Sequence, residues 1–243
     1  FSMSAYHQRQ PLENNGLSAN LEHFGPENNQ SLLVKLLSEM RQNKDLIKQM
    51  RKMPRFERYF KSAPDIKNKD MEELGHAINT YNTVVEMARL DPELGGADVS
   101  RMKLTALIHD LGELEEGDIS YDEKKDSDEE KEKQVFLRKL ESFFPGLGQD
   151  ELGALKKIYF EIALTKDKTK GEALYFSMVE RLGYLKTALQ EFESQSEAID
   201  WQWLCANVLH NQGKKILLLM QEMPVALALA LPYLDSTHTS SPF

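Results

Sequence analysis

Residues 107–119 read LIHDLGELEEGDI, and this stretch sets the fold and the chemistry that we expect. An apolar helix is predicted to run directly into His109 and Asp110. A buried imidazole beside a buried carboxylate is costly unless both groups are satisfied. A shared divalent cation would satisfy both, because imidazole nitrogen and carboxylate oxygen together suit Mn, Fe, Co, Zn or Mg. The alternative is a buried histidine that hydrogen-bonds to its neighbour or to the backbone.

Two further carboxylates follow the pair. Glu113 lies four residues after His109, so the two side chains share one face if the helix persists that far. That position suits a general acid or a base that orients water. Gly117 and Asp118 would bring another carboxylate back on a turn. Without a function, Glu113 would be an exposed helix residue and Asp118 an ordinary turn residue.

Of the six histidines, His76 is the best candidate for a further ligand, 33 residues before His109. We expect it on the polar edge of a helix over Met71–Leu90, and two antiparallel helices would bring the two histidines together. The alternative is a surface histidine. The apolar stripe predicted for this helix is Leu74, Ile78, Tyr81, Val85 and Ala88, and its polar face is His76, Asn79, Thr80 and Thr83.

A lone histidine followed by a His-Asp pair at this distance resembles the signature of the HD superfamily of metal-dependent phosphohydrolases. The stretch HDLGELEEGDI is similar to the HD-x-x-E-x-x-x-G-D-[IL] pattern of the 5'-deoxynucleotidase branch, which includes the bacterial enzymes and the eukaryotic HD-domain-containing protein 2. The charged segment 122–133 (DEKKDSDEEKEK) also resembles the linker of that branch. The resemblance covers roughly Met40–Glu222.

The resemblance implies one divalent metal ion (Mn, Co, Fe, Mg or Zn) held by four residues. Three of them map to His76, His109 and Asp110. The fourth is an aspartate on a later helix in the family, but the matching segment 176–185 (FSMVERLGYL) has Glu180 instead, with Asp167 as a competing candidate. Glu180 could also simply form an ion pair with Arg181 or Lys186 on a solvated face.

The resemblance also assigns the remaining roles at the site. Glu113 and Asp118 match the carboxylates that assist the chemistry in the family. An arginine before the first histidine helps to hold the substrate phosphate there, and the best match is Arg55, with Arg58 as the alternative. A guanidinium group suits a phosphate because its planar fork donates two parallel hydrogen bonds.

The function implied is hydrolysis of the phosphomonoester of a (deoxy)nucleoside 5'-monophosphate. One alternative keeps the site and changes the substrate to a triphosphate, a cyclic nucleotide or an alarmone. The other is a degenerate HD domain that binds a ligand or a partner without turnover, which Glu180 in place of aspartate would permit. The partner expected is a small-molecule nucleotide, and homodimers are common in the family.

Composition limits the other classes of function. The net charge is -9 and no basic cluster stands out, which argues against a nucleic-acid-binding module. The single cysteine, Cys205, excludes a disulfide framework and fits a reducing, cytoplasmic setting. The longest apolar run, Pro224–Leu231, is too short for a membrane span of roughly 20 residues, so no membrane partner is expected.

The chain shows no sustained strand alternation, and helix-forming residues are plentiful. We therefore predict an all-α fold, a single helical bundle over 31–235, with a flexible N-terminal tail (1–30) and a C-terminal tail (236–243). Besides the helix over Met71–Leu90, we predict one helix that begins at Ser31 and ends near Pro54, and another that is capped by Ser100 and reaches Leu111. Four more are predicted over Phe136–Phe144, Glu151–Leu164, Tyr175–Phe192 and Ile199–Met223.

Overall fold

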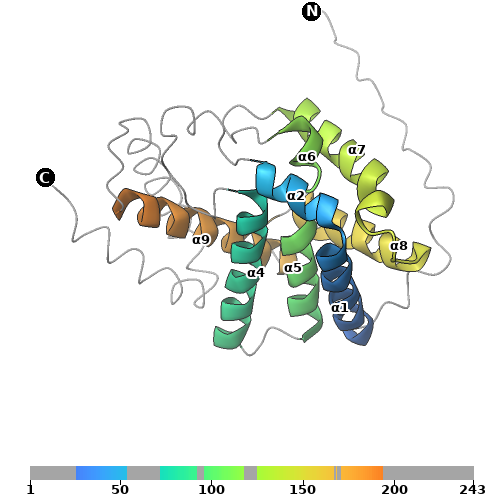
Figure 1. Cartoon of the computed structure of the whole chain (residues 1–243). Helices are drawn as coiled ribbons and strands as arrows, with labels where there is room; N and C mark the ends of the chain where they lie inside the picture. Colours follow the sequence, from blue (N-terminus) through green and yellow to red (C-terminus); the bar gives the residue numbers. More distant parts are fainter. Residues whose placement is uncertain are drawn as a thin grey trace, which may run out of the picture.

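The structure is a computed structural model of the chain and describes residues 26–53, 72–91, 96–117, 125–166, 168 and 171–193. These residues form helices and no β-sheet, which confirms the predicted all-α fold (Figure 1). In chain order the elements are α1 (Pro26–Gln42), α2 (Lys44–Lys52), α4 (Glu73–Leu90), α5 (Gly96–Ile108), α6 (Glu113–Glu116), α7 (Asp126–Phe143), α8 (Gln149–Ile158), the π-helix η3 (Tyr159–Ala163) and α9 (Gly171–Glu193).

The antiparallel helices α4 and α5 form the centre of the molecule (Figure 1). Helix α1 packs against α5, α9 crosses behind α4, and α2 lies across the upper ends of the central pair. Leu36 of α1, Leu104 and Ile108 of α5 and Phe176 of α9 are fully buried in one core. Each side chain of this size contributes roughly 1.5–3 kcal/mol when removed from water.

The inward face of α4 carries polar side chains beside the apolar Ala77, Val84 and Met87, so the predicted division of this helix into an apolar inner stripe and a polar outer face was wrong. His76, Asn79, Thr80 and Thr83 are all buried. Of the predicted apolar stripe, Ile78 is 49% exposed and Val85 is 40% exposed, whereas Leu74 and Tyr81 are partly buried against the core. Ala88 is also partly buried.

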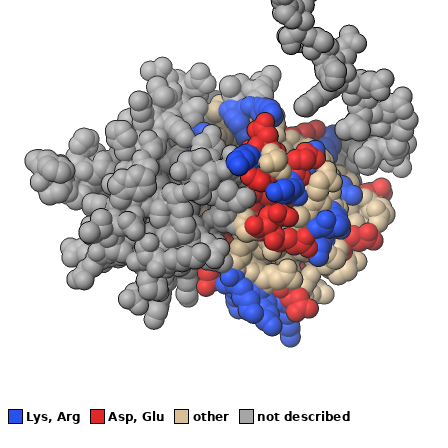
Figure 2. All heavy atoms as spheres, turned by 90° about the horizontal axis from the view of Figure 1, so that it is seen from above, with Lys and Arg blue, Asp and Glu red and all other residues tan. Residues whose placement is uncertain are grey.

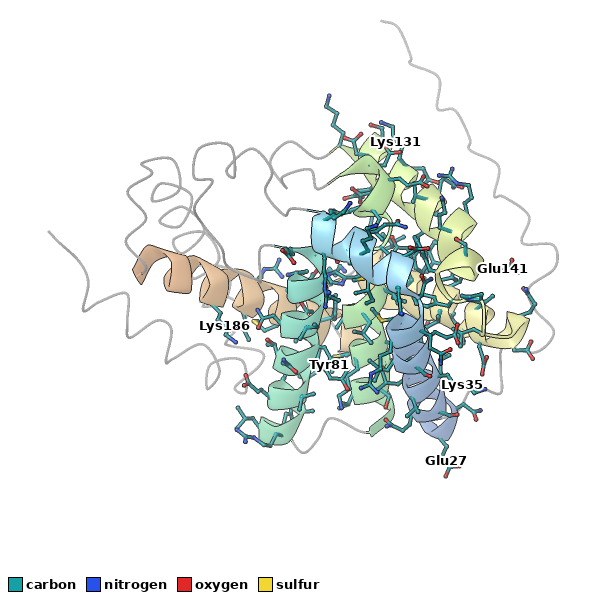
Figure 3. All side chains as sticks on the ribbon, in the orientation of Figure 1. Glu27, Lys35, Tyr81, Lys131, Glu141 and Lys186 are labelled. Carbon is teal, nitrogen blue, oxygen red and sulfur yellow. The ribbon has the colours of Figure 1, made fainter. Side chains whose placement is uncertain are left out.

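Hydrogen bonds explain how α4 tolerates a polar interior. Thr83 Oγ1 donates to the carbonyl of Asn79 at 2.9 Å, and Lys186 Nζ of α9 donates to Asn79 Oδ1 at 3.2 Å. Figure 3 shows Lys186 reaching toward α4, and Tyr81 directed toward α5, where Lys103 Nζ lies 5.7 Å from its ring centroid. Because these polar groups have partners, burying them carries little penalty.

Two helix boundaries also differ from the predictions. The first predicted helix is broken at Asn43, whose Oδ1 accepts from Leu46 N (3.0 Å) while its Nδ2 donates to the carbonyl of Phe143 (2.9 Å). An asparagine that caps a helix in this way starts a new one, so α1 ends and α2 begins here. Ser100 is not a cap but lies inside α5, where its hydroxyl donates to Gln30 Oε1 at 2.9 Å.

The remaining helices overlap the predicted ones, but α7 begins at Asp126 and not at Phe136, and α9 begins at Gly171 and not at Tyr175. Helix α7 begins inside the charged segment 122–133, and the helix predicted over Glu151–Leu164 passes from α8 into the π-helix η3. The helix predicted over Ile199–Met223 and the C-terminal tail lie outside the described residues, and α1 begins at Pro26, inside the predicted N-terminal tail. Within the described ranges, no helix combines the length and the apolar character that crossing a membrane requires.

Candidate metal centre

Three side chains from two helix ends converge at one point. His76 comes from the first turn of α4, and His109 and Asp110 follow directly after α5. The Nε2 atoms of the two histidines lie 3.2 Å apart. Asp110 Oδ2 lies 3.1 Å from His109 Nε2 and 3.5 Å from His76 Nε2. The antiparallel arrangement of α4 and α5 therefore brings together residues that are 33 positions apart in the sequence.

The two imidazole rings are held inside the protein. His76 and His109 are buried, and the Asp110 side chain is 15% exposed. The ring of His109 packs edge-on against Phe176 of α9, at 5.3 Å between centroids and an interplanar angle of 79°. Thr80 Oγ1 lies 3.5 Å from His76 Nε2. Phe176 therefore holds the ring of His109, and Thr80 lies beside the ring of His76, so that the Nε2 atoms of both rings stay directed into the cluster.

A tight turn links the His-Asp pair to Glu113. Helix α5 ends at Ile108, so the helix does not persist to Glu113 as the one-face argument assumed. Instead residues 109–112 turn, and Glu113 N donates to the carbonyl of Asp110 at 2.9 Å. The turn still returns Glu113 to the site, where its side chain is 5% exposed.

This turn needs a glycine because it lies against α7. A Cβ atom added to Gly112 would lie 2.3 Å from the carbonyl oxygen of Glu132, which is closer than real Cβ contacts come. The neighbouring atom is backbone and cannot swing away. The glycine after the His-Asp pair therefore fixes the distance between α7 and the metal centre.

Sequence reasoning missed one carboxylate. Glu73, at the start of α4, is only 1% exposed, and its carboxylate lies within 4.8 Å of those of Asp110 and Glu113. Its backbone N–H donates to the carbonyl of Met53 at 3.2 Å, which fixes this end of the helix. The spacing of three residues to His76 places both on one helix face and was the available signal.

Glu180 of α9 lies at the edge of the cluster. Its Oε1 is 3.7 Å from His109 Nε2, and its side chain is 27% exposed. Two groups of three side chains have ligand atoms within 4.8 Å of one another, and Glu180 belongs to neither: one is His76, His109 and Asp110, and the other is Glu73, Asp110 and Glu113. The alternative ion pairs of Glu180 are not formed among the described residues, because Arg181 donates to Ser177 and Lys186 to Asn79.

Electrostatics favour a cation at this point. Burial lowers the pKa of His109, but the carboxylates of Asp110, Glu180 and Glu73 outweigh burial and raise it to about 9. In the described part of the chain, the Nδ1 atom of His109 is buried without a hydrogen-bond partner. The strong attraction for positive charge is therefore directed at Nε2, the atom that faces His76 and Asp110.

The donor set fits a divalent metal ion. Two imidazole nitrogens and one carboxylate oxygen, with a second carboxylate nearby, match the preferences of Zn, Mn, Fe or Co. The 3.2 Å between the two Nε2 atoms is also compatible with one shared ion, because two nitrogen ligands each about 2.0–2.1 Å from an ion lie roughly this far apart. The residues present are therefore suited to hold one cation.

Four sequence candidates cannot be placed. Arg55, Arg58, Asp118 and Asp167 lie outside the described residues. Their roles stay predictions. The structure thus brings together His76, His109, Asp110 and Glu113, adds Glu73, and leaves Glu180 at the margin.

Comparison with known proteins adds one finding. The family described as HD domain matches residues 73–222, more than half of the chain. The matched range begins at Glu73 and contains both histidines, Asp110 and Glu180. Among curated proteins, none matches the chain.

Proposed function

Because this chain belongs to the HD-domain family, whose members are typically metal-dependent phosphohydrolases, we propose that it hydrolyses the phosphomonoester of a (deoxy)nucleoside 5'-monophosphate. The observation that supports the proposal best is the convergence of His76, His109 and Asp110 beside the buried Glu113. The finer assignment to the 5'-deoxynucleotidase branch rests on the register of Glu113, Gly117 and Asp118 after the His-Asp pair.

In this proposal His76, His109 and Asp110 hold a divalent cation, with Glu180 as the ligand from α9. The bound cation supplies Lewis acidity to the phosphoryl group and to a water molecule. The two histidines contribute neutral nitrogen ligands, and Asp110 contributes the negative charge that offsets part of the charge of the ion. The packing of His109 against Phe176 keeps its Nε2 directed at the site.

The remaining residues act on the substrate. Glu113 is buried next to Asp110 and would donate a proton to the departing 5' oxygen, the role of a general acid. Asp118 would orient the attacking water or the sugar. Arg55 would neutralise a phosphate oxygen through its guanidinium fork. These two assignments rest on the sequence pattern.

The test is phosphate release from a panel of nucleoside monophosphates, with added Mn²⁺, Co²⁺ or Mg²⁺. We expect at least one deoxynucleoside 5'-monophosphate to be hydrolysed, and a chelator to abolish the reaction. Glu113→Ala should remove turnover and leave the metal bound. If no monophosphate in the panel releases phosphate with any of the three ions, the nucleotidase proposal is wrong.

The position of Glu180 favours a second candidate, an HD domain that binds a nucleotide without turnover. Glu180 lies outside the tight group of ligand atoms, with its Oε1 3.7 Å from His109 Nε2, so the ligand from α9 is the weakest part of the proposed site. Elemental analysis separates the two, because a catalytic site should hold close to one metal ion per chain. Product analysis with triphosphates and cyclic nucleotides would identify a related substrate.

A further inference from the structure

A basic pocket lies at the elbow between α1 and α2, and none of the residues that line it belongs to the cluster of histidines and carboxylates. Its volume is about 490 Å³, and Ile47 lies in its wall. The other residues that line it are cations: Arg41, Lys44, Lys48, Arg51 and Lys52. Helix α2 lies at the front in Figure 1, and on that side Figure 2 shows a gathering of Lys and Arg at the lower edge of the described surface.

These five cations take no part in the ion pairs and side-chain hydrogen bonds of the described residues, and all five are exposed. Other cations are paired, such as Lys35 with Glu151 and Arg138 with Glu115. The five therefore leave a concentrated positive charge on a protein whose net charge is -9.

The arrangement works against the stability of α2. Lys44, Lys48 and Lys52 follow one another at intervals of four residues, and like charges at that spacing repel on a helix face. In residues 41–52, Asp45 is the single acidic residue among five basic ones. A multivalent anion in the pocket would relieve this repulsion, because its negative charges would attract each of the neighbouring cations.

The shape of the pocket indicates a small molecule. Pockets for small ligands measure about 300–1,000 Å³, and this volume lies within that range. A flat membrane surface fits a concave elbow poorly, and Leu46 and Met50, the buried apolar residues of α2, point into the core and cannot insert into lipid. Ile47 and the aliphatic stems of the long side chains offer an apolar wall beside the charges.

We propose that this elbow binds a small molecule that carries several adjacent phosphates, of the class of a nucleoside triphosphate, at a site separate from the metal centre. All six lining residues belong to α1 and α2, and none is among the candidate ligands of the cation. The site therefore does not depend on the proposed hydrolysis.

The experiment is a calorimetric titration of the full chain with adenosine triphosphate and with inorganic triphosphate at low salt. The double variant Lys48→Glu/Arg51→Glu is compared with the control variant Lys156→Glu/Lys157→Glu. The control reverses two adjacent cations of α8 that form no ion pair among the described residues, and it makes the same change in net charge. Lys48→Ala/Arg51→Ala serves if charge reversal prevents folding, and circular dichroism checks each variant.

We expect the pocket variant to bind adenosine triphosphate at least about tenfold more weakly, which corresponds to about 1.4 kcal/mol, and the α8 variant to bind within about twofold of the unmodified chain. The alanine pair should weaken binding several-fold. Metal content and monophosphate hydrolysis should not change in the pocket variants, so failure here is distinguishable from failure of the proposed function. Binding should also weaken as salt is added.

Four results would overturn the proposal. The first is equal loss in both charge-reversal variants, which means attraction by net charge alone. The second is loss of binding in His109→Ala but not in the pocket variants, which places the anion at the metal centre. The third is no binding of either probe at about 1 mM, the range of the weakest specific ligands. The fourth is binding of duplex nucleic acid or anionic vesicles through these residues without binding of either small probe.

Discussion

Replacement of Gly112 by alanine places a methyl group where the backbone of α7 already lies. The added Cβ would be 2.3 Å from the Glu132 carbonyl oxygen and 2.8 Å from its carbonyl carbon. The backbone angles of Gly112, φ -66° and ψ -28°, suit alanine, so the penalty is steric and not conformational. Relief of the clash requires α7 and the turn at 109–112 to separate.

The expected loss is about 1–3 kcal/mol, the usual cost of forcing an extra group into a packed interior. In a chain of this size each kcal/mol lowers Tm by about 2–4 °C. Because the same turn carries His109 and Asp110, the metal content of the variant should fall as well. Thermal and denaturant unfolding measure the first effect, and elemental analysis of the purified variant measures the second.

Gly183→Ala is the matched control. It is the same substitution in the interior of α9, where the nearest atom to the new Cβ would be Asn79 Nδ2 at 4.0 Å, an ordinary contact. Alanine in a helix interior is more stable than glycine by roughly 0.5–1 kcal/mol, so Tm should rise. A Gly112→Ala variant as stable as the unmodified chain would refute the packing of this turn against α7.

Three further predictions concern the cluster itself. His109→Ala should reduce bound metal from about one ion per chain to nearly none. Glu113→Ala should keep the metal and lower turnover by about 10²–10⁴-fold. Equal loss of metal in the two variants would contradict the assignment of His109 as a ligand and Glu113 as an acid. Glu73→Gln should weaken metal binding, measured by competition with a chelator, because it removes one buried charge beside Asp110, and Glu72→Gln, its exposed neighbour, should have no effect. In the metal-free chain, the pKa of His109 is about 9 against an ordinary 6.5, so its protonated form stabilises the fold fully below about pH 6.5 and this contribution is lost as pH rises toward 9. Metal affinity should rise over the same pH interval, because the ion competes with the proton for His109. The assay measures Tm and Mn²⁺ binding of the unmodified chain and of His109→Gln at each pH. If the unmodified chain exceeds His109→Gln in Tm by more at pH 9 than at pH 6, the assignment is contradicted.

The sequence was sufficient for the parts of the site that depend on spacing. The interval between His76 and His109 required two antiparallel helices, and α4 and α5 provide them. The four-residue spacing correctly predicted that Glu113 lies near the His-Asp pair, but it assumed a continuous helix. In the structure a turn brings Glu113 back to the site. Spacing alone does not distinguish these two routes.

Features that depend on what surrounds a helix were not predictable. The polar face of α4 is buried because α9 supplies a partner for Asn79, and periodicity cannot show that a polar face has partners. Glu73 was missed because an acid at a helix start usually has a capping or solvent role. The basic pocket was missed because the overall charge is negative, and it forms only where Asn43 bends the chain between α1 and α2.

The measurement that tests the central claim most directly is a crystal structure of the chain grown with Mn²⁺, with anomalous diffraction recorded to locate the ion. The claim predicts one ion per chain, bound to the Nε2 atoms of His76 and His109 and to a carboxylate oxygen of Asp110. Nitrogen and oxygen ligands of this kind lie at about 2.0–2.2 Å in Zn sites, and similar distances are expected here. An ion bound elsewhere, or a site without metal in which the two imidazoles bond to each other, would contradict it.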